Sequence, residues 1–140
     1  MADPVILLAA MVEELRITED NFRTLYSKAI APQHSLDAEG NIIDVSDHWL
    51  HLMGYARERV IGRPFAEFLE QSSAERWRRG RPKFLAQGDE TAQAFEFVKC
   101  SGEIVEALVS RRVERDMTGQ VVRTLNVMTD VAPRRSTSMR

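Results

Sequence analysis

The stretch that decides the fold is HSLDAEGNIIDVSDHWLHLMGYARERVIGRPFAEFL, residues 34–69. Turn-forming residues at 37–40 lie between a short apolar run and the β-branched run at 42–45, and this pattern predicts a hairpin of two strands. Ser46 or Asp47 then caps a short helix. The residues that follow, through the Gly-Arg-Pro segment, predict two more short helices. A hairpin followed at once by short helices indicates a fold that mixes α and β elements.

Further along the chain, the pattern predicts one longer helix and three more strands. Ser72 or Ser73 caps the helix, which continues to about Ala86. The strands are expected at residues 92–99, 104–114 and 121–128. The turns between these strands are too short for parallel crossovers, so consecutive strands must be antiparallel. We therefore expect an α+β fold, with a five-stranded antiparallel sheet and helices over one face.

The amino end predicts an amphipathic helix over residues 4–16, because Asp3 is a good N-cap and Pro4 suits the first helical position. Its apolar residues recur at helical spacing and form one stripe: Val5, Leu8, Met11, Val12 and Leu15. A small domain has little surface against which to bury such a stripe. We therefore expect it to form the interface of a homodimer.

Composition sets limits on the partners. The chain has 140 residues with 44% hydrophobic content, enough for a single core. Its 19 basic and 21 acidic residues are intermixed, so no overall field favours nucleic acid or an anionic membrane. The apolar run at residues 5–12 is too short to span a bilayer, and we expect no membrane contact. Cys100 is the only cysteine, which excludes an intramolecular disulfide and fits a cytoplasmic protein.

Three segments, taken together in order and spacing, resemble the PAS family of sensory domains: LDAEGNIIDVSD at 36–47, LMGYARERVIG at 52–62 and VVRTLNVMTDVAPR at 121–134. The resemblance implies the PAS fold over residues 22–133, with the helix and its cap before it at 1–21 and a frayed tail after it at 134–140. It also implies a sensory or regulatory module of a signal-transduction protein, such as a two-component system, that responds to a small ligand or a partner.

PAS domains place ligands between the inner face of the sheet and the helices, so the resemblance also suggests a pocket. The large apolar residues expected to line it are Trp49, Met53, Phe65, Phe68, Trp77, Phe84, Phe97 and Met128. Such residues suit a small apolar ligand. The same side chains at these spacings are also typical of an ordinary packed core, and the sequence leaves both interpretations open.

The sequence argues against a flavin cofactor. In the PAS branch that binds flavin, a reactive cysteine soon follows a Gly-Arg pair on the central helix, whereas here residues 62–65 read Gly-Arg-Pro-Phe and Cys100 lies beside a later turn. Phe97, Ala107 and Met128 stand where sheet amides would be expected to hold the flavin ring. Each lost hydrogen bond to a buried flavin atom would cost about 1–3 kcal/mol.

Haem and metal ions are also disfavoured. Some PAS domains bind haem through a histidine on the long central helix, but residues 72–86 contain none, and Trp77 stands at the corresponding place. His34, His48 and His51 lie elsewhere in the chain, without further ligands at a recognisable spacing. We therefore expect no haem and no metal.

One dense basic patch runs from Arg76 to Lys83 and contains Arg-Gly-Arg-Pro, which resembles the core of a minor-groove DNA-binding motif. It suggests an alternative function as a DNA-associated regulatory protein. A single copy in a helical setting is more typical of a solvated helix face, so nucleic acid is not the expected partner. Gly80 and Pro82 also predict a local break in the helix.

The chain contains no recognisable catalytic motif, and no enzymatic activity is expected. Asp130-Val131-Ala132-Pro133-Arg134 resembles the segment through which PAS domains pass into a linker. By this resemblance, Asp130 would tie the last strand to a departing helix and relay the signal. The recipient would be an output domain or a signalling partner protein.

Overall fold

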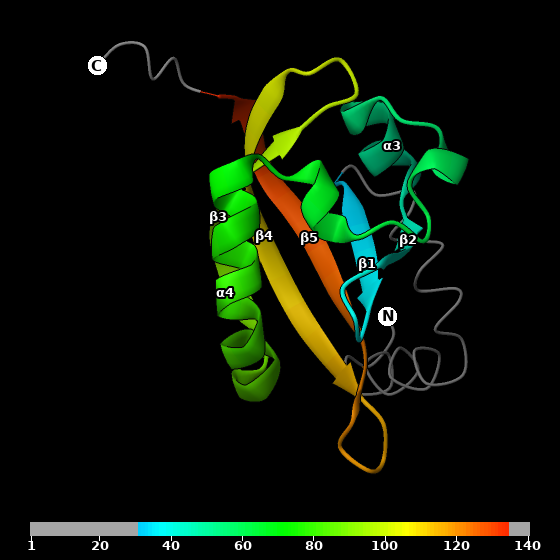
Figure 1. The fold of residues 1–140 in the computed structure, drawn as a ribbon, viewed down its shortest axis with the longest axis vertical. Coiled ribbons are helices and arrows are strands. Elements are labelled where there is room, and N and C mark those ends of the chain that lie inside the picture. The colour runs from blue at the N-terminus through cyan, green and yellow to red at the C-terminus, as the bar shows by residue number, and fades with distance from the viewer. Residues whose placement is uncertain (1–30, 135–140) are drawn as a thin grey trace, which may run out of the picture.

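The computed structural model describes residues 31–134 and shows one five-stranded antiparallel sheet with the strand order β2-β1-β5-β4-β3. The strands are β1 (Gln33–Asp37), β2 (Ile42–Val45), β3 (Glu90–Val98), β4 (Ile104–Arg115) and β5 (Val121–Pro133). Between β2 and β3 the chain forms α3 (Asp47–Met53), the 3-10 helices η1 (Arg57–Arg59) and η2 (Phe65–Phe68), and α4 (Gln71–Gln87). Figure 1 shows α4 lying over β3 and β4, with α3 at the β1–β2 side. The predicted α+β fold is confirmed.

The hairpin and the first helix form for the reasons that the sequence indicates. The backbone N–H of Asp37 donates to the carbonyl of Asn41 at 2.9 Å, and Gly40 takes a φ of +89° that suits glycine. The Ser46 hydroxyl caps α3 by accepting from the N–H of Trp49, and Gly54 ends the helix in the left-handed conformation. These local signals therefore set the β1–β2–α3 order.

Helix α4 departs from the prediction at two places. Its N-cap is Glu70, whose carboxylate accepts from the N–H groups of Ser72 and Ser73, so neither serine is the cap. The predicted break is also wrong, because the helix continues through Pro82 to Gln87. Pro82 is exposed, so its ring faces solvent and its missing N–H removes one bond without ending the helix.

Strand β5 extends to Pro133, five residues beyond the predicted end at Met128. A bulge lies opposite Ala107, where the pairing shifts between Leu108–Thr129 and Glu106–Ala132. Asp130 sits in this bulge with a φ of +51°. The extra residue interrupts the alternation of buried and exposed positions on which a strand prediction depends. The alternation therefore ends before the bulge, although the strand continues.

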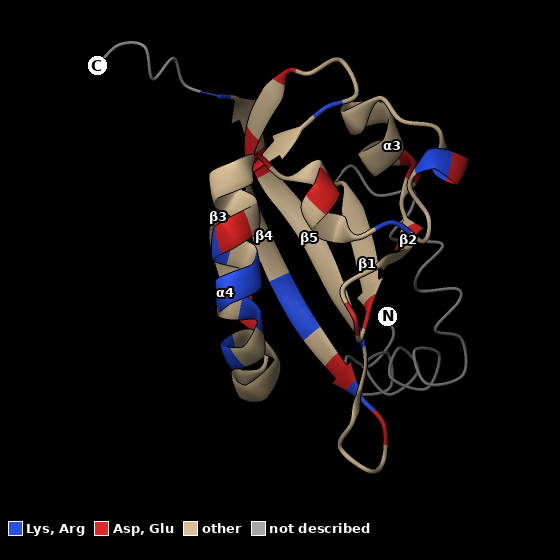
Figure 2. Ribbon diagram, in the orientation of Figure 1, with Lys and Arg blue, Asp and Glu red and all other residues tan. Residues whose placement is uncertain are grey.

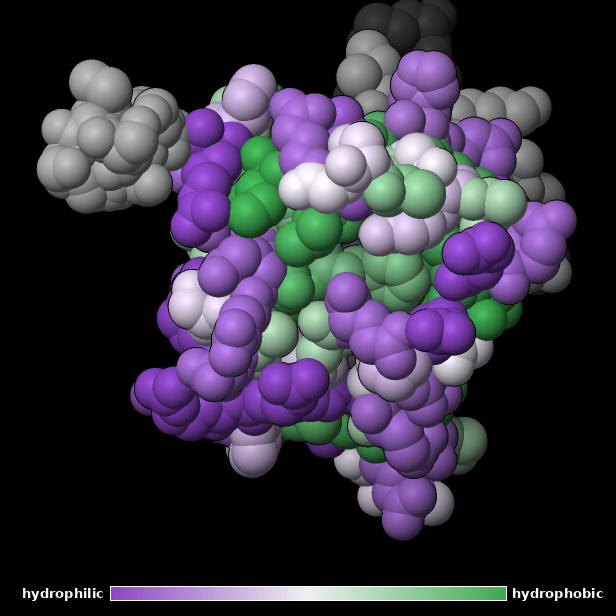
Figure 3. All heavy atoms as spheres, turned by 45° about the horizontal axis from the view of Figure 1, so that its top comes forward, coloured by the Kyte–Doolittle hydropathy of each residue, from purple (hydrophilic) through white to green (hydrophobic). Residues whose placement is uncertain are grey.

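The core lies between the inner face of the sheet and the helices. Alternate residues of the last three strands are buried, as the two-residue period of a strand requires: Phe95 and Phe97, Val105, Ala107 and Val109, and Thr124, Asn126 and Met128. On the face shown in Figure 3, hydrophobic side chains gather in a central band and hydrophilic ones surround them. The amphipathic helix predicted at 4–16 lies outside the described residues.

Candidate functional site

The eight residues predicted to line a pocket are all buried: Trp49, Met53, Phe65, Phe68, Trp77, Phe84, Phe97 and Met128. Several of their rings contact one another directly. Phe65 lies 5.3 Å from Trp77 and 5.8 Å from Phe97, measured between ring centroids, and Trp49 lies 5.7 Å from Phe68. Seven of the eight belong to one contiguous apolar core, and Phe84 packs apart from it. The structure therefore brings these residues together as packed side chains, and their role in ligand binding stays a prediction.

A row of polar side chains crosses this inner face. His34 on β1 pairs with Asn126 on β5, Asn126 pairs with Arg111 on β4, and Arg111 pairs with Glu90 on β3. His34 and Asn126 are each 1% exposed, and Arg111 is 7% exposed. Directly paired residues of a sheet point to the same face. The row therefore places three buried polar groups beneath the helices.

Each member of this buried row has a polar atom without a hydrogen-bond partner within residues 31–134. These atoms are Nδ1 of His34, Oδ1 of Asn126 and Nη1 of Arg111. The Asn126 amide is held in place by its nitrogen, which donates to the carbonyl of His34 at 3.1 Å and to that of Thr124 at 3.3 Å. A buried polar group left unpaired costs about 1–3 kcal/mol. A ligand or an ordered water molecule that bonds these three groups would remove this cost.

His34 is neutral in this setting. Burial, and then the positive charge of Arg111, lower the pKa of His34 from 6.5 to about 3. Its ring stacks on that of Phe65, with the centroids 4.4 Å apart. A neutral imidazole can both donate and accept a hydrogen bond, so His34 keeps one ring nitrogen of each kind at neutral pH.

Arg111 carries the buried charge. Its Nε and Nη2 atoms both donate to Oε1 of Glu90, the former at 3.1 Å. The guanidinium carbon lies 3.9 Å from the centroid of the Phe84 ring, a cation–π contact. Glu90 neutralises the charge on one side, while Nη1 has no acceptor within residues 31–134.

Helix α4 brings a second guanidinium to the same interior. Arg81 lies one turn after Trp77 and one turn before Phe84, and its Nη2 atom donates to the carbonyls of Asp37 and Ala38 in the β1–β2 turn. Its Nη1 atom is buried and has no partner among the described residues. Burial, and then the charge of Arg111, lower the pKa of Arg81, so each arginine lies within the electrostatic reach of the other. Figure 2 shows basic residues along α4 and a basic segment on β4.

Two arginines of the patch from Arg76 to Lys83 therefore make contacts within the domain. Arg76 donates to the carbonyl of Ala94 at 2.6 Å and lies over the Phe95 ring, while Arg81 holds the hairpin turn. These contacts fix α4 on the sheet. The DNA-binding alternative gains no support from this geometry, because two of its arginines already have partners in the fold.

Sequence analysis set His34 aside with the other histidines and gave Asn126 no role. Arg111 was missed altogether. The signal was present in the alternation of β4, since Val105, Ala107 and Val109 lead to residue 111 on the same face. A charged residue at an inward position of a strand marks either a pair or a ligand contact.

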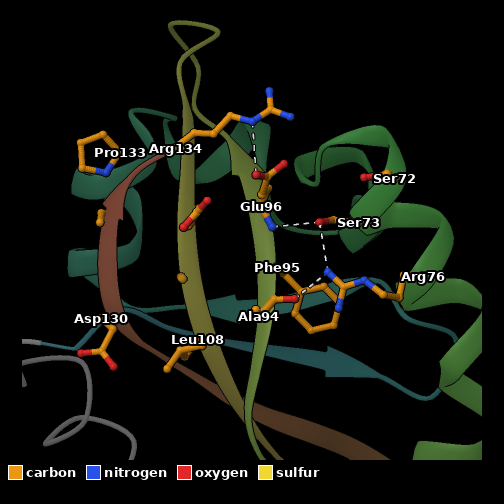
Figure 4. Close-up of a pocket in the computed structure, with 13 residues that line it drawn as sticks. Ser72, Ser73, Arg76, Ala94, Phe95, Glu96, Leu108, Asp130, Pro133 and Arg134 are labelled. Carbon is orange, nitrogen blue, oxygen red and sulfur yellow. Dashed lines mark hydrogen bonds and ion pairs between the residues drawn. The ribbon is translucent and has the colours of Figure 1, made fainter. Parts of the chain in front are cut away.

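An open groove of about 650 Å³ lies where the start of α4 meets the ends of β3, β4 and β5. Figure 4 shows Ser73 and Arg76 on its helical side, Glu96 in the middle and Asp130 at the far side. Nε of Arg134 bonds Oε2 of Glu96 at 3.2 Å, and the Ser73 hydroxyl accepts from the N–H of Glu96 at 2.9 Å. Asp130 lies within β5, and the strand goes on to Pro133, so the strand does not end before Asp130 as predicted. Whether it relays a signal stays a prediction.

The predicted dimer stripe (Val5, Leu8, Met11, Val12 and Leu15) lies outside the described residues. Within residues 31–134, no helix is long and apolar enough to cross a membrane.

The order of elements, with the helical segment inserted between the second and third strands, agrees with a family comparison. The model of the PAS fold matches residues 27–136. This chain belongs to the PAS family. PAS domains are generally sensory and signalling modules. No curated protein matches the sequence.

Solved PAS structures share the fold at low sequence identity. A PAS domain from Colwellia psychrerythraea is 20% identical, with a TM-score of 0.72 over 79% of this chain and 94% of that one. A PAS domain of an HTR-like protein from Haloarcula marismortui is 21% identical, with a TM-score of 0.66 over 86% and 98% of the two chains. The PAS-B domain of Drosophila melanogaster Cycle, solved with ethylene glycol, is 12% identical, with a TM-score of 0.65 over 72% and 99%. At these identities the likeness concerns the fold of this PAS domain.

Proposed function

We propose that this PAS domain is the sensory module of a signal-transduction protein and binds a small ligand between its helices and the inner face of its sheet. The observation that carries the proposal is the row of His34, Asn126 and Arg111, three buried polar side chains that each leave an atom unpaired within residues 31–134. An inert core avoids such groups, because replacing them with apolar residues of similar shape would remove the penalty. The aromatic residues around the row supply the apolar wall that ligand pockets usually have.

Two features support a route by which ligand binding is signalled to a partner or output domain. Strand β5 carries Asn126 in the row and continues to Pro133 in the groove, so one central strand joins the two places. Asp130 is exposed in the β5 bulge with a positive φ, a conformation that costs a residue other than glycine about 1–2 kcal/mol. We propose that a partner or output domain contacts this groove, and that Asp130 relays the change. The homodimer through the amino-terminal stripe is part of the same proposal.

The test uses the full chain purified without denaturation. The protein is denatured and the released small molecules are identified by mass spectrometry, with a heat-treated buffer fraction as control. We expect a colourless protein, without haem or flavin absorption bands, that releases a molecule in stoichiometric amount or shows a raised melting temperature with members of a metabolite library. A chain that releases nothing and is stabilised by no library member would contradict the ligand-binding function.

A further inference from the structure

Two arginines, from opposite sides of the domain interior, each present an unpaired nitrogen atom. Arg111 reaches up from β4 and Arg81 reaches in from α4, and Nη1 of each is buried without a partner within residues 31–134. Trp77 and Phe84 lie on either side of Arg81 along α4: the guanidinium carbon of Arg81 is 5.0 Å from the centroid of the Trp77 ring, and that of Arg111 is 3.9 Å from the centroid of the Phe84 ring. Guanidinium N–H groups are donors only, so the missing partner must be an acceptor.

The ion pairs of this interior favour an anion as the acceptor. Arg111 has one carboxylate partner, Glu90, whereas the hydrogen bonds of Arg81 within the described residues go to backbone carbonyls. The carboxylates of Asp37 and Glu39 lie within electrostatic reach of Arg81 and favour its charged form, but neither forms an ion pair with it, and Oδ1 of Asp37 accepts from the N–H groups of Glu39 and Asn41. One positive charge therefore lacks an ion pair inside the described part of the fold. A monoanion balances it, while a phosphate, with a charge of about −1.5 to −2 near neutral pH, would leave an excess negative charge.

The other polar and aromatic groups near the two arginines indicate what else the ligand must carry. Oδ1 of Asn126 is an acceptor without a partner among residues 31–134, so the ligand carries a donor such as a hydroxyl group. The neighbouring rings are those of Phe65 and Trp77, whose centroids are 5.3 Å apart, and of Phe84 against Arg111, and such rings favour a flat apolar skeleton in the ligand.

We infer that the space between α4 and the His34–Asn126–Arg111 row binds a small organic monocarboxylate, which bridges Nη1 of Arg81 and Nη1 of Arg111 and donates a hydrogen bond to Asn126. The inference rests on the proposed ligand-binding function and adds the chemical class of the ligand. Arg81 also holds the β1–β2 turn, so occupancy of this site tightens the contact between α4 and the hairpin.

Isothermal calorimetry on the full chain tests the class of ligand with four probes. The probes are para-hydroxybenzoate, benzoate, para-hydroxybenzamide and inorganic phosphate. We expect para-hydroxybenzoate to bind most tightly, because it offers both the carboxylate and the donor. The neutral amide is expected to bind at least about tenfold more weakly, since hydrogen bonds to charged groups contribute more than neutral ones. An amide or phosphate that binds as well as the acid overturns the inference.

Two variants of α4 then test whether Arg81 contacts the ligand. Arg81→Met removes the proposed ligand contact, and Arg79→Met makes the same change of charge at an exposed position of α4. We expect Arg81→Met to weaken para-hydroxybenzoate binding at least about tenfold, and Arg79→Met to leave it unchanged. Equal effects of the two substitutions overturn the inference. The comparison of acid with amide on the unmodified chain stands even if Arg81→Met folds poorly.

The two proposals fail in different ways. A native protein that releases a neutral molecule, or binds only neutral library members, overturns the carboxylate site and leaves the ligand-binding function in place. A protein that releases no molecule and binds neither the probes nor the library overturns both.

Discussion

At the scale of single residues, His34 links burial to a measurable dependence of stability on pH. Its pKa in the folded protein is about 3, against about 6.5 in the unfolded chain. The unfolded state therefore takes up a proton below pH 6.5 while the folded state does not, so stability falls as the pH is lowered from about 6.5 to about 3. We expect urea denaturation to show a loss of about 2 kcal/mol between pH 7.5 and 5.

The control for this prediction is His34→Gln, which keeps a polar side chain but cannot take up the proton. Its free energy of unfolding at neutral pH is lower, because the stacking on Phe65 is lost, but its change between pH 7.5 and 5 should be much smaller. Glu70 and Asp116, whose pKa values are lowered by hydrogen bonds from Ser72 and Thr118, contribute only at more acidic pH. An unaltered slope in His34→Gln would show that another group titrates in this range.

The row that contains His34 shows which features of the candidate site can be predicted from the sequence and which cannot. Alternation along β4 and β5 is a local property, so the inward positions of Val109 and Asn126 can be predicted. The register between strands is not local: His34 and Asn126 are far apart in sequence and meet only when β1 pairs with β5. The candidate site was therefore predicted as an apolar pocket, and its polar row emerged only from the sheet.

At the scale of elements, α4 shows how a helix can tolerate two unfavourable residues when tertiary contacts hold it. Arg76 and Arg81 bond backbone carbonyls of β3 and the β1–β2 turn, and Trp77 and Phe84 are buried. Sequence analysis counted the local penalties of Gly80 and Pro82 but could not count these long-range contacts. The predicted break was wrong for this reason.

A pair of glycine substitutions follows from this view of α4. A Cβ atom added at Gly80 meets no atom within 4 Å, so Gly80→Ala should stabilise the protein by about 1 kcal/mol through helix propensity. Gly40 has a φ of +89°, and a Cβ there would lie 3.0 Å from Cη2 of Trp77. We therefore expect Gly40→Ala to destabilise by at least about 1–2 kcal/mol. Thermal or urea unfolding measures both, and a destabilised Gly80→Ala would indicate that α4 needs its glycine for a reason outside helix propensity.

At the scale of the whole molecule, the order of elements proved the most predictable property. Turn residues, caps and alternation each act within a few residues, and together they indicated the α+β class and the PAS resemblance. The position of β5 between β1 and β4 was not predicted, because the pairing of strands that are distant in sequence is not a local property. The bulge at Asp130 was missed because nothing local distinguishes the extra residue from the end of a strand.

The last prediction concerns assembly, through the helix that the sequence predicts over residues 4–16. Replacing Leu8 and Leu15 with Glu should convert a dimer into a folded monomer, measured by multi-angle light scattering. Burying a leucine contributes about 1.5–3 kcal/mol, so the four leucines lost from a symmetric interface amount to about 6–12 kcal/mol. A dimer with a micromolar dissociation constant is held by about 8 kcal/mol, so this loss is enough to separate the protomers. Ile6→Glu with Ala10→Glu adds the same charge on the opposite side of the predicted helix, and should remain dimeric. If the Leu8 and Leu15 variant stays dimeric as well, the protomers meet through another surface, and the sheet of the PAS domain becomes the next place to test.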